Sequence, residues 1–209
     1  MAHSVSVSCP SCGGTIEDTT AHTRSLACPQ CGNWVYLGSN GWESAGLFEH
    51  AIDAPSMFQL GKSGQLMQRT FVVTGRVRLS YGGGEGFWDE WWLEFDDGNH
   101  QWLEEDDGTY RMHEPVDVSS DASSLAEPLA GASVGGNLVI DGESWFVSER
   151  LEATVAGVQG SLPVAIVPGE NVVCIDVMGS GNKMSIEASD NEVQFSRSDV
   201  VRASAFNWH

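Results

Sequence analysis

The sequence predicts a mainly β fold in which a small N-terminal ribbon precedes two repeated small β-barrel or sandwich units. Three observations lead to this class. Two Cys-x-x-Cys pairs lie near the N-terminus, short runs of β-branched and aromatic residues fill most of the later chain, and Gly- or Asp-bearing turns separate these runs. Apart from a weak helical pattern at residues 123–130, we therefore expect strands throughout.

Four cysteines predict the ribbon. The pattern Cys-Pro-x-Cys-Gly begins at Cys9 and again at Cys28. The Gly that follows each second Cys permits a tight turn, so both thiolates of a pair can face one ion, and two such pairs complete tetrahedral Zn²⁺. Redox-active Cys-x-x-Cys motifs are the alternative, but they favour a βαβ context that this Gly- and Ser-rich segment lacks. We predict one structural Zn²⁺ held by Cys9, Cys12, Cys28 and Cys31.

A connector is expected after the ribbon. Gly41 and Gly46 fall in residues 39–54, and Pro55 follows them. Glycine and proline at this density interrupt the periodicity of helices and strands. The predicted boundaries are a zinc ribbon at residues 1–38 and a connector at residues 39–54.

The first β unit is predicted at residues 55–118. Its strand-like runs lie at residues 70–81, 91–95, 100–103 and 110–112. Residues 96–99, Asp-Asp-Gly-Asn, separate two of them and are typical of a hairpin turn. A polar spacer at residues 119–124 follows.

The second β unit is predicted at residues 126–203. Its strand-like runs lie at residues 137–140, 144–158, 163–167, 172–177, 183–187 and 192–195. Residues 145–152 parallel residues 71–78 of the first unit, and residues 173–177 match residues 91–95. These matches predict a diverged internal repeat, with two small β units side by side.

The charge of the chain argues against two classes of partner. The 209 residues carry 10 Lys and Arg against 29 Asp and Glu, which gives a formal net charge of −19. Proteins that bind nucleic acid or anionic lipid gather their cations in a patch, whereas the cations here are scattered along the chain. We expect neither nucleic acid nor an anionic membrane surface as a partner.

Composition indicates a folded protein of the cytoplasm. Eight Trp and eight Phe supply a core that a disordered acidic chain would lack. No stretch approaches the ~20 consecutive apolar residues of a membrane span, and no basic region followed by an apolar core marks a signal peptide. We expect a cytoplasmic location and no membrane insertion.

A segment rich in tryptophan and carboxylates is the densest chemical feature. Residues 71–114 carry three Arg and eleven Asp or Glu. Aromatic faces and carboxylates together attract cations, so a polyamine or a Lys- and Arg-rich partner segment would bind here. Because alternate residues of a strand share one face, we expect Trp91 and Trp102 in the core. The exposed residues expected to bind a ligand or partner are then Trp88, Asp89, Glu90 and Trp92.

This segment resembles a bacterial family called domain of unknown function 4178. The similarity lies in residues 71–78, residues 86–98 with their Trp-Asp-Glu-Trp element, and residues 101–103, and it extends from Pro55 to Arg202. Residues 159–163, Gln-Gly-Ser-Leu-Pro, are similar to the family's Glu-Gly-Glu-Leu-Pro element, with Gln and Ser in place of its carboxylates. The resemblance implies a β-rich fold with no established activity. Because members are often encoded beside membrane-stress proteins and polyamine-synthesis enzymes, it also implies an accessory role.

We therefore expect a non-enzymatic interaction module that binds a protein partner through the Trp-rich acidic surface. The alternative is a small-molecule sensor that captures a polyamine or another cation on the same surface. No nucleophile–base pair indicates an enzyme: residues 131–135 match Gly-x-Ser-x-Gly without the strand-to-helix context of a nucleophile elbow, and Cys174 lies in an apolar run typical of a buried thiol.

Overall fold

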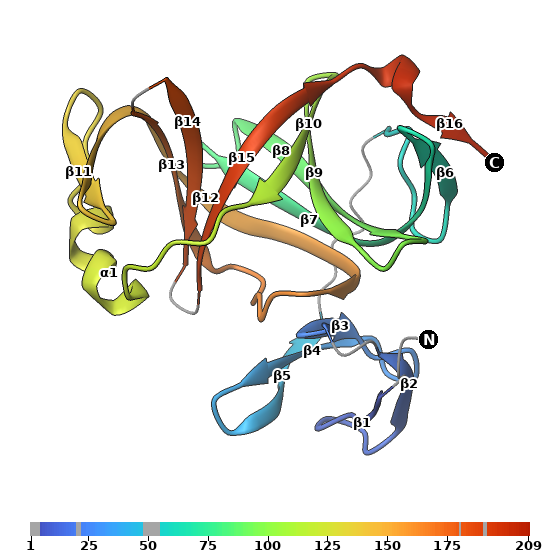
Figure 1. Cartoon of the computed structure of the whole chain (residues 1–209). Coiled ribbons are helices and arrows are strands. Elements are labelled where there is room, and N and C mark those ends of the chain that lie inside the picture. Colours follow the sequence, from blue (N-terminus) through green and yellow to red (C-terminus); the bar gives the residue numbers. More distant parts are fainter. Residues whose placement is uncertain (1–4, 20–21, 48–54, 180, 190–191) are drawn as a thin grey trace.

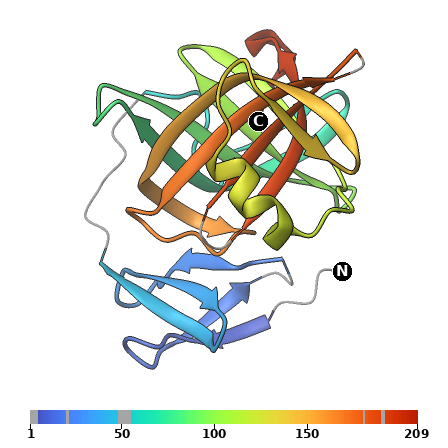
Figure 2. The ribbon, with the colours of Figure 1, turned by 90° about the vertical axis from the view of Figure 1, so that its left-hand side faces the viewer.

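The computed structural model describes residues 5–19, 22–47, 55–179, 181–189 and 192–209. The described residues form sixteen β-strands, one α-helix and one short 3₁₀ helix, so the predicted mainly β class is confirmed. Figures 1 and 2 show a barrel with the N-terminal ribbon lying beneath it.

The ribbon consists of a hairpin and a three-stranded sheet. Its strands are β1 (Val5–Ser8), β2 (Thr15–Thr19), β3 (Ser25–Ala27), β4 (Asn33–Gly38) and β5 (Gly41–Leu47). Strand β5 occupies residues that the sequence assigned to a connector, because it pairs with β4 along its length. Gly41 and Gly46 have positive φ angles of 109° and 90°, so these glycines serve a turn and an irregularity within paired structure rather than ending it. Residues 48–54 of the predicted connector lie outside the described residues.

Two four-stranded meanders build the barrel. The first contains β7 (Arg69–Tyr81), β8 (Gly86–Phe95), β9 (His100–Asp106) and β10 (Thr109–Pro115). The second contains β12 (Glu143–Leu162), β13 (Asn171–Gly179), β14 (Asn182–Ala188) and β15 (Val193–Val201). The predicted hairpin turn joins β8 to β9, with Gly98 at a φ of 83°.

The two meanders close into one eight-stranded barrel. Strand β7 pairs with β12, and β10 pairs with β15, both antiparallel. The sequence predicted two units side by side; the structure joins their strands into a single barrel, because this pairing satisfies the backbone edges that separate units would expose. The matched residues 71–78 and 145–152 lie on the first strand of each meander. The internal repeat itself stays a prediction.

One predicted strand does not form. Residues 163–167 are irregular. Their backbone carbonyls are taken by ribbon side chains instead of a neighbouring strand: the Ser25 hydroxyl donates to the Val164 carbonyl at 2.7 Å, and the Trp34 indole N–H donates to the Ile166 carbonyl at 2.9 Å. The apolar run that suggested a strand therefore joins the ribbon to the barrel.

Short elements cover two sides of the barrel. On one side lie β6 (Ser63–Leu66), the 3₁₀ helix (Ala203–Ala205) and β16 (Asn207–Trp208), with Phe58 and Phe206 packed on Phe71 and Trp91. On the other lie helix α1 (Ala122–Ala130), which confirms the weak helical pattern, and β11 (Asn137–Ile140). Within the described residues, no helix has the length and apolar character needed to span a membrane.

Side chains that face inward form two regions. One region is an apolar cluster to which the ribbon contributes Trp34, packed with Leu79, Trp92, Val155 and Leu162. The other region is polar and lines a cavity, described below. Along each barrel strand, the side chains that face the interior alternate with the side chains that pack outward against the short elements.

Gly160 lies at a close approach between β12 and β7. It pairs with Gly75, and its φ is 75°. A Cβ at position 160 would collide with the backbone oxygen of Thr74. We expect Gly160→Ala to destabilise the protein by at least the ~1–3 kcal/mol of a strained backbone position. Urea unfolding compares it with Gly142→Ala, which has the same φ sign and open space around it; equal losses for both variants would contradict this account.

Candidate functional site

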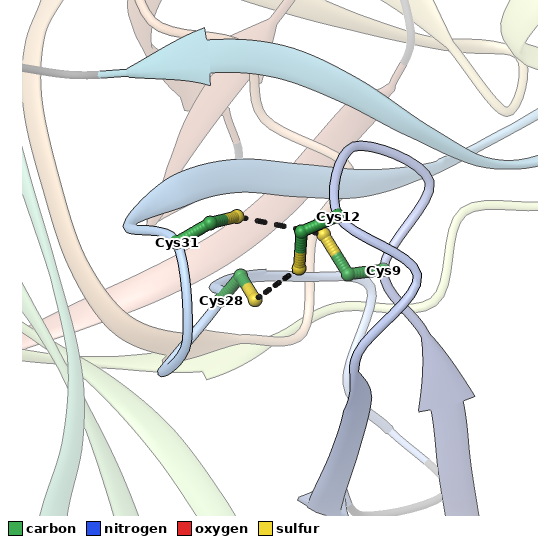
Figure 3. Close-up of side chains that lie close together, drawn as sticks. All are labelled: Cys9, Cys12, Cys28 and Cys31. Atoms are coloured by element: carbon green, nitrogen blue, oxygen red, sulfur yellow. Dashed lines mark hydrogen bonds between the residues drawn. The ribbon is translucent and has the colours of Figure 1, made fainter.

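The four ribbon cysteines converge on one point, as Figure 3 shows. Each Cys-x-x-Cys pair closes the same turn: the N–H of Gly13 donates to the Cys9 carbonyl and the N–H of Gly32 donates to the Cys28 carbonyl, both at 2.9 Å. Both glycines have a φ of 73°, which only glycine adopts freely. The Gly that follows the second Cys of each motif therefore has the backbone role that the sequence predicted.

The spacing of the sulfurs suits a metal ion. The distance between the Sγ atoms is 3.8 Å for Cys9 and Cys31 and 3.9 Å for Cys12 and Cys28. All four Sγ atoms lie within 4.8 Å of one another. Tetrahedral coordination with metal–sulfur bonds of about 2.3 Å places sulfurs about 3.8 Å apart. Cys9, Cys12, Cys28 and Cys31 are thus able to hold a metal ion.

A neighbouring amide favours the thiolate form of Cys31. The side-chain N–H of Asn33 donates to the Cys31 sulfur at 3.2 Å. Hydrogen bonding from the side chain and backbone of Asn33 lowers the pKa of Cys31 to about 6. Since metals bind thiolates, this contact prepares the ligand for the ion.

The ribbon is attached to the barrel by direct hydrogen bonds. Strand β3 pairs with the end of β12, where Leu26 lies opposite Ser161. The hydroxyl groups of Thr23 and Ser161 lie 3.0 Å apart, close to the Ser25 and Trp34 contacts given above. The metal centre therefore belongs to an element that closes one end of the barrel.

Asp89 is not exposed, contrary to the sequence prediction. Its carboxylate accepts two hydrogen bonds each from Arg76 and Arg78, at 2.7–3.0 Å. Both Asp89 and Arg76 are only 4% exposed. The Arg76 guanidinium also lies over the Trp91 ring, 4.4 Å from its centroid. Asp89 is thus the centre of a buried ion cluster on the outer side of β8.

Trp88, Glu90 and Trp92 face the barrel interior, so these residues do not form the exposed surface expected from the sequence. Trp92 is buried among the apolar interior side chains. Glu90 is 7% exposed and accepts a hydrogen bond from the Trp88 indole at 2.8 Å. The physical reason is the strand period: Asp89 and Trp91 point outward, whereas their even-numbered neighbours point into the closed barrel. Their role in binding a ligand or partner stays a prediction.

The polar part of the interior is a cavity of about 400 Å³. This volume falls in the range of small-molecule sites, roughly 300–1,000 Å³. Its walls come from β8, β9, β10, β14, β15 and the segment that leads to α1. The lining side chains on which the argument depends are Glu90, Trp102, His113, Asp117, Glu187 and Glu192.

The cavity is acidic. Four of its lining residues are Asp or Glu, and no Lys or Arg occurs among the described residues that line it. Burial, and next the charge of Glu187, raise the pKa of Glu90 well above its ordinary value. Burial, and next the charge of Glu104, raise the pKa of Glu187 to about 7. Strongly raised carboxyl pKa values in a cavity are typical of a binding or catalytic site.

A hydrogen-bond network orders one wall. His113 is 8% exposed; its two ring nitrogens lie 2.9 Å from the Ser196 hydroxyl and 3.2 Å from the Glu104 carboxylate. Arg111 also pairs with Glu104. Glu104 therefore has two partners. Burial alone would raise the pKa of Glu104, but its interactions with His113 and Arg111 together lower it.

Sequence reasoning missed most of this site. Trp102 was expected in the core, yet it is half-buried and lines the cavity beside Trp92, with ring centroids 4.9 Å apart. His113, Glu187 and Glu192 were not among the residues predicted to form a site. The sequence did carry a signal for these residues. Glu90, Trp102 and Glu187 each alternate along their strand with apolar residues that face the other side of the sheet. Cys174, which was expected to be a buried thiol, is half-buried, and burial raises its pKa.

Comparison with known proteins gives one finding. No curated protein and no solved structure matches the chain. The family model described as "Domain of unknown function (DUF4178)" matches residues 59–203, which include all eight barrel strands and every residue lining the cavity. The ribbon lies before the matched region. The chain therefore belongs to the DUF4178 family.

Proposed function

We propose that this protein is a non-enzymatic binding module whose barrel cavity takes up a small organic cation. The observation that carries the proposal is the acidic lining: Glu90, Glu187, Glu192 and Asp117 share one cavity with no Lys or Arg among its described walls. A cation would offset the repulsion among these carboxylates. The Trp102 ring supplies an aromatic surface that gains about 0.5–2 kcal/mol with a cation over its face.

A small molecule fits the geometry better than a protein partner. Asp89, Glu90 and Trp92 are each less than a tenth exposed, so a partner could not dock on them without opening the barrel. A polyamine is the cation suggested by the family resemblance. We therefore choose spermidine as the first probe.

We propose Zn²⁺ as the ion of the ribbon, in a structural role. Four thiolates at tetrahedral spacing are the donor set that zinc prefers, and they leave no coordination position for water. By holding the ribbon in its fold, the metal would maintain the hydrogen bonds between the ribbon and residues 161–166. Metal analysis is expected to find one zinc per chain.

The experiment for the cavity is titration calorimetry with spermidine at pH 8. We expect wild-type protein to bind, with an affinity that falls as salt rises. Glu187→Gln removes a buried charge of nearly the same shape, so we expect at least about tenfold weaker binding, or ~1.4 kcal/mol. Glu149 is exposed on β12, so Glu149→Gln is the matched control and should bind spermidine as wild type does. Equal affinity for all three proteins would place the site elsewhere.

A further inference from the structure

A second, smaller hollow lies beside the cavity. Its volume is about 50 Å³, against about 400 Å³ for the cavity. Three side chains, those of Glu187, Glu192 and Gln194, line both spaces. Glu187 of β14 is paired with Gln194 of β15, so this shared boundary is built on two neighbouring strands. The hollow and the cavity therefore meet at these three side chains.

The wall of the hollow that faces this boundary is apolar. It consists of the side chains of Val164, Ala165, Ile166 and Val172. Val164 and Val172 are 9% and 6% exposed and belong to the apolar interior cluster that also contains Trp34. The hollow thus differs in character from the cavity, because it places an apolar surface next to the carboxyl groups of the boundary.

Hydrogen bonds to the ribbon occupy the polar backbone of this apolar wall. The Val164 carbonyl accepts a hydrogen bond from Ser25, and the Ile166 carbonyl accepts one from Trp34. Neither donor is among the described residues that line the hollow. These two carbonyls are therefore satisfied by the ribbon, and the wall offers a ligand its apolar side chains.

The size of the hollow suits a short hydrocarbon chain. A space of about 10–15 Å³ holds one water-sized group, so 50 Å³ holds about four such groups. A methylene group is close to water in size. The hollow therefore accommodates an unbranched chain of about four carbons.

We infer that the protein selects organic cations that carry an unbranched alkyl chain of about four carbons. The ammonium group lies at the boundary beside Glu187 and Glu192, and the chain lies in the hollow. The inference rests on the proposed function and adds the class of ligand. Each methylene that moves from water into the hollow is expected to raise the affinity about fourfold, until the hollow is filled.

A second charge at the end of such a chain is compatible with this arrangement. Ala165, Ile166 and Ser189 of the hollow are only half-buried, and Glu192 is exposed, so the hollow reaches the protein surface. An ammonium group at the far end of the chain would remain hydrated there and would avoid the cost of burying an unpaired charge. Linear polyamines such as spermidine therefore belong to the same class of ligand.

The test compares two ammonium ions that have the same charge and the same number of carbons. Methyl ¹³C NMR of the whole labelled protein follows titration with n-butylammonium and with tert-butylammonium at pH 8. Every carbon of tert-butylammonium lies within two bonds of the nitrogen, so it cannot fill the hollow while its charge stays at the boundary. We expect n-butylammonium to bind at least about tenfold more tightly, with NOEs to the methyl groups of Val164 and Ile166.

A variant that fills the hollow provides the second arm. Ala165→Leu adds a larger side chain at a half-buried position of the apolar wall. It should weaken the binding of n-butylammonium about tenfold and leave that of tert-butylammonium unchanged, which would also show that the cavity is still folded. Ala203→Leu, at an exposed position outside both spaces, is the matched control and should bind both ions as wild type does.

The outcomes separate this inference from the proposed function. Equal affinity of wild type for the two ions, or unchanged n-butylammonium affinity in Ala165→Leu, would overturn the inference and leave the proposed function standing. Binding of spermidine without binding of either ion would do the same. If Ala165→Leu loses both ions, the NOEs in wild type decide, and their absence overturns the inference. Absence of binding by spermidine and by both ions would overturn the inference and the proposed function together.

Discussion

Removal of the ribbon metal is expected to have the largest effect on this protein. Without its ion the four-cysteine centre has only short strands to hold it, and in such small motifs the metal-binding free energy of about 10–16 kcal/mol is largely folding free energy. We expect the ribbon at residues 5–47 to unfold. Hydrogen exchange with and without a chelator measures this, and the ribbon amides should lose protection first.

The barrel should also respond, because the ribbon contributes to its interior. Trp34 is 1% exposed and packs in the same cluster as Val77, Leu79 and Trp92. Losing a buried tryptophan from a core costs about 3–5 kcal/mol, so the melting temperature of the barrel should fall with that of the ribbon. If the chelator left both the hydrogen-exchange protection and the melting temperature of the barrel unchanged, this coupling would be contradicted.

Cysteine variants provide the matched comparison. Cys28→Ser removes one thiolate of the centre and should abolish stoichiometric zinc. Cys174→Ser changes a cysteine in β13, away from the centre, and should retain one zinc per chain. Stoichiometric zinc in Cys28→Ser, or its loss in Cys174→Ser, would show that the ion is held elsewhere.

The second large effect is expected at Asp89. Asp89→Asn keeps the shape of the side chain and removes the carboxylate that pairs with Arg76 and Arg78. Because breaking a buried pair leaves uncompensated charge, we expect a loss of about 3–5 kcal/mol in unfolding free energy. Denaturant unfolding measures it.

The control for Asp89 is an exposed pair of the same composition. Asp97 accepts two hydrogen bonds from Arg69, and both side chains are about a third exposed. Exposed pairs contribute little because water and salt screen them. Asp97→Asn should therefore leave the unfolding midpoint near that of wild type. An equal loss of unfolding free energy in both variants would mean that burial does not determine how much Asp89 contributes to stability.

The ribbon was the part most open to prediction from sequence. A duplicated Cys-Pro-x-Cys-Gly pattern specifies local turns, and local turns depend on nearby residues alone. The strand at residues 137–140 and the hairpin at residues 96–99 were predictable for the same reason, since alternation and Asp-Gly turns are local signals.

Barrel closure was not predictable, because it depends on pairing between distant strands. The contact of Gly75 with Gly160 joins residues 85 positions apart, and nothing near either glycine reveals its partner. Closure then decides which strand face is inside. Without it, the alternation in residues 88–92 left both assignments open, so Asp89 and Glu90 were both placed on the surface.

The cavity was missed for a related reason. Glu90, Trp102 and Glu187 come from β8, β9 and β14, and each taken alone resembles a half-exposed strand residue. Only the closed barrel brings their side chains to one space. The burial that raises the pKa of Glu90 and Glu187 is likewise a property of the assembled interior.

The most direct test of the cation-binding cavity is an intermolecular NOE experiment with ¹³C-labelled protein and unlabelled spermidine. The cavity account predicts NOEs from the spermidine methylene protons to the indole ring of Trp102, which lines the cavity. It predicts none to Phe87, which is 49% exposed on the outside of β8. NOEs to Phe87 and other exposed rings without any to Trp102 would show a diffuse surface interaction and contradict the account.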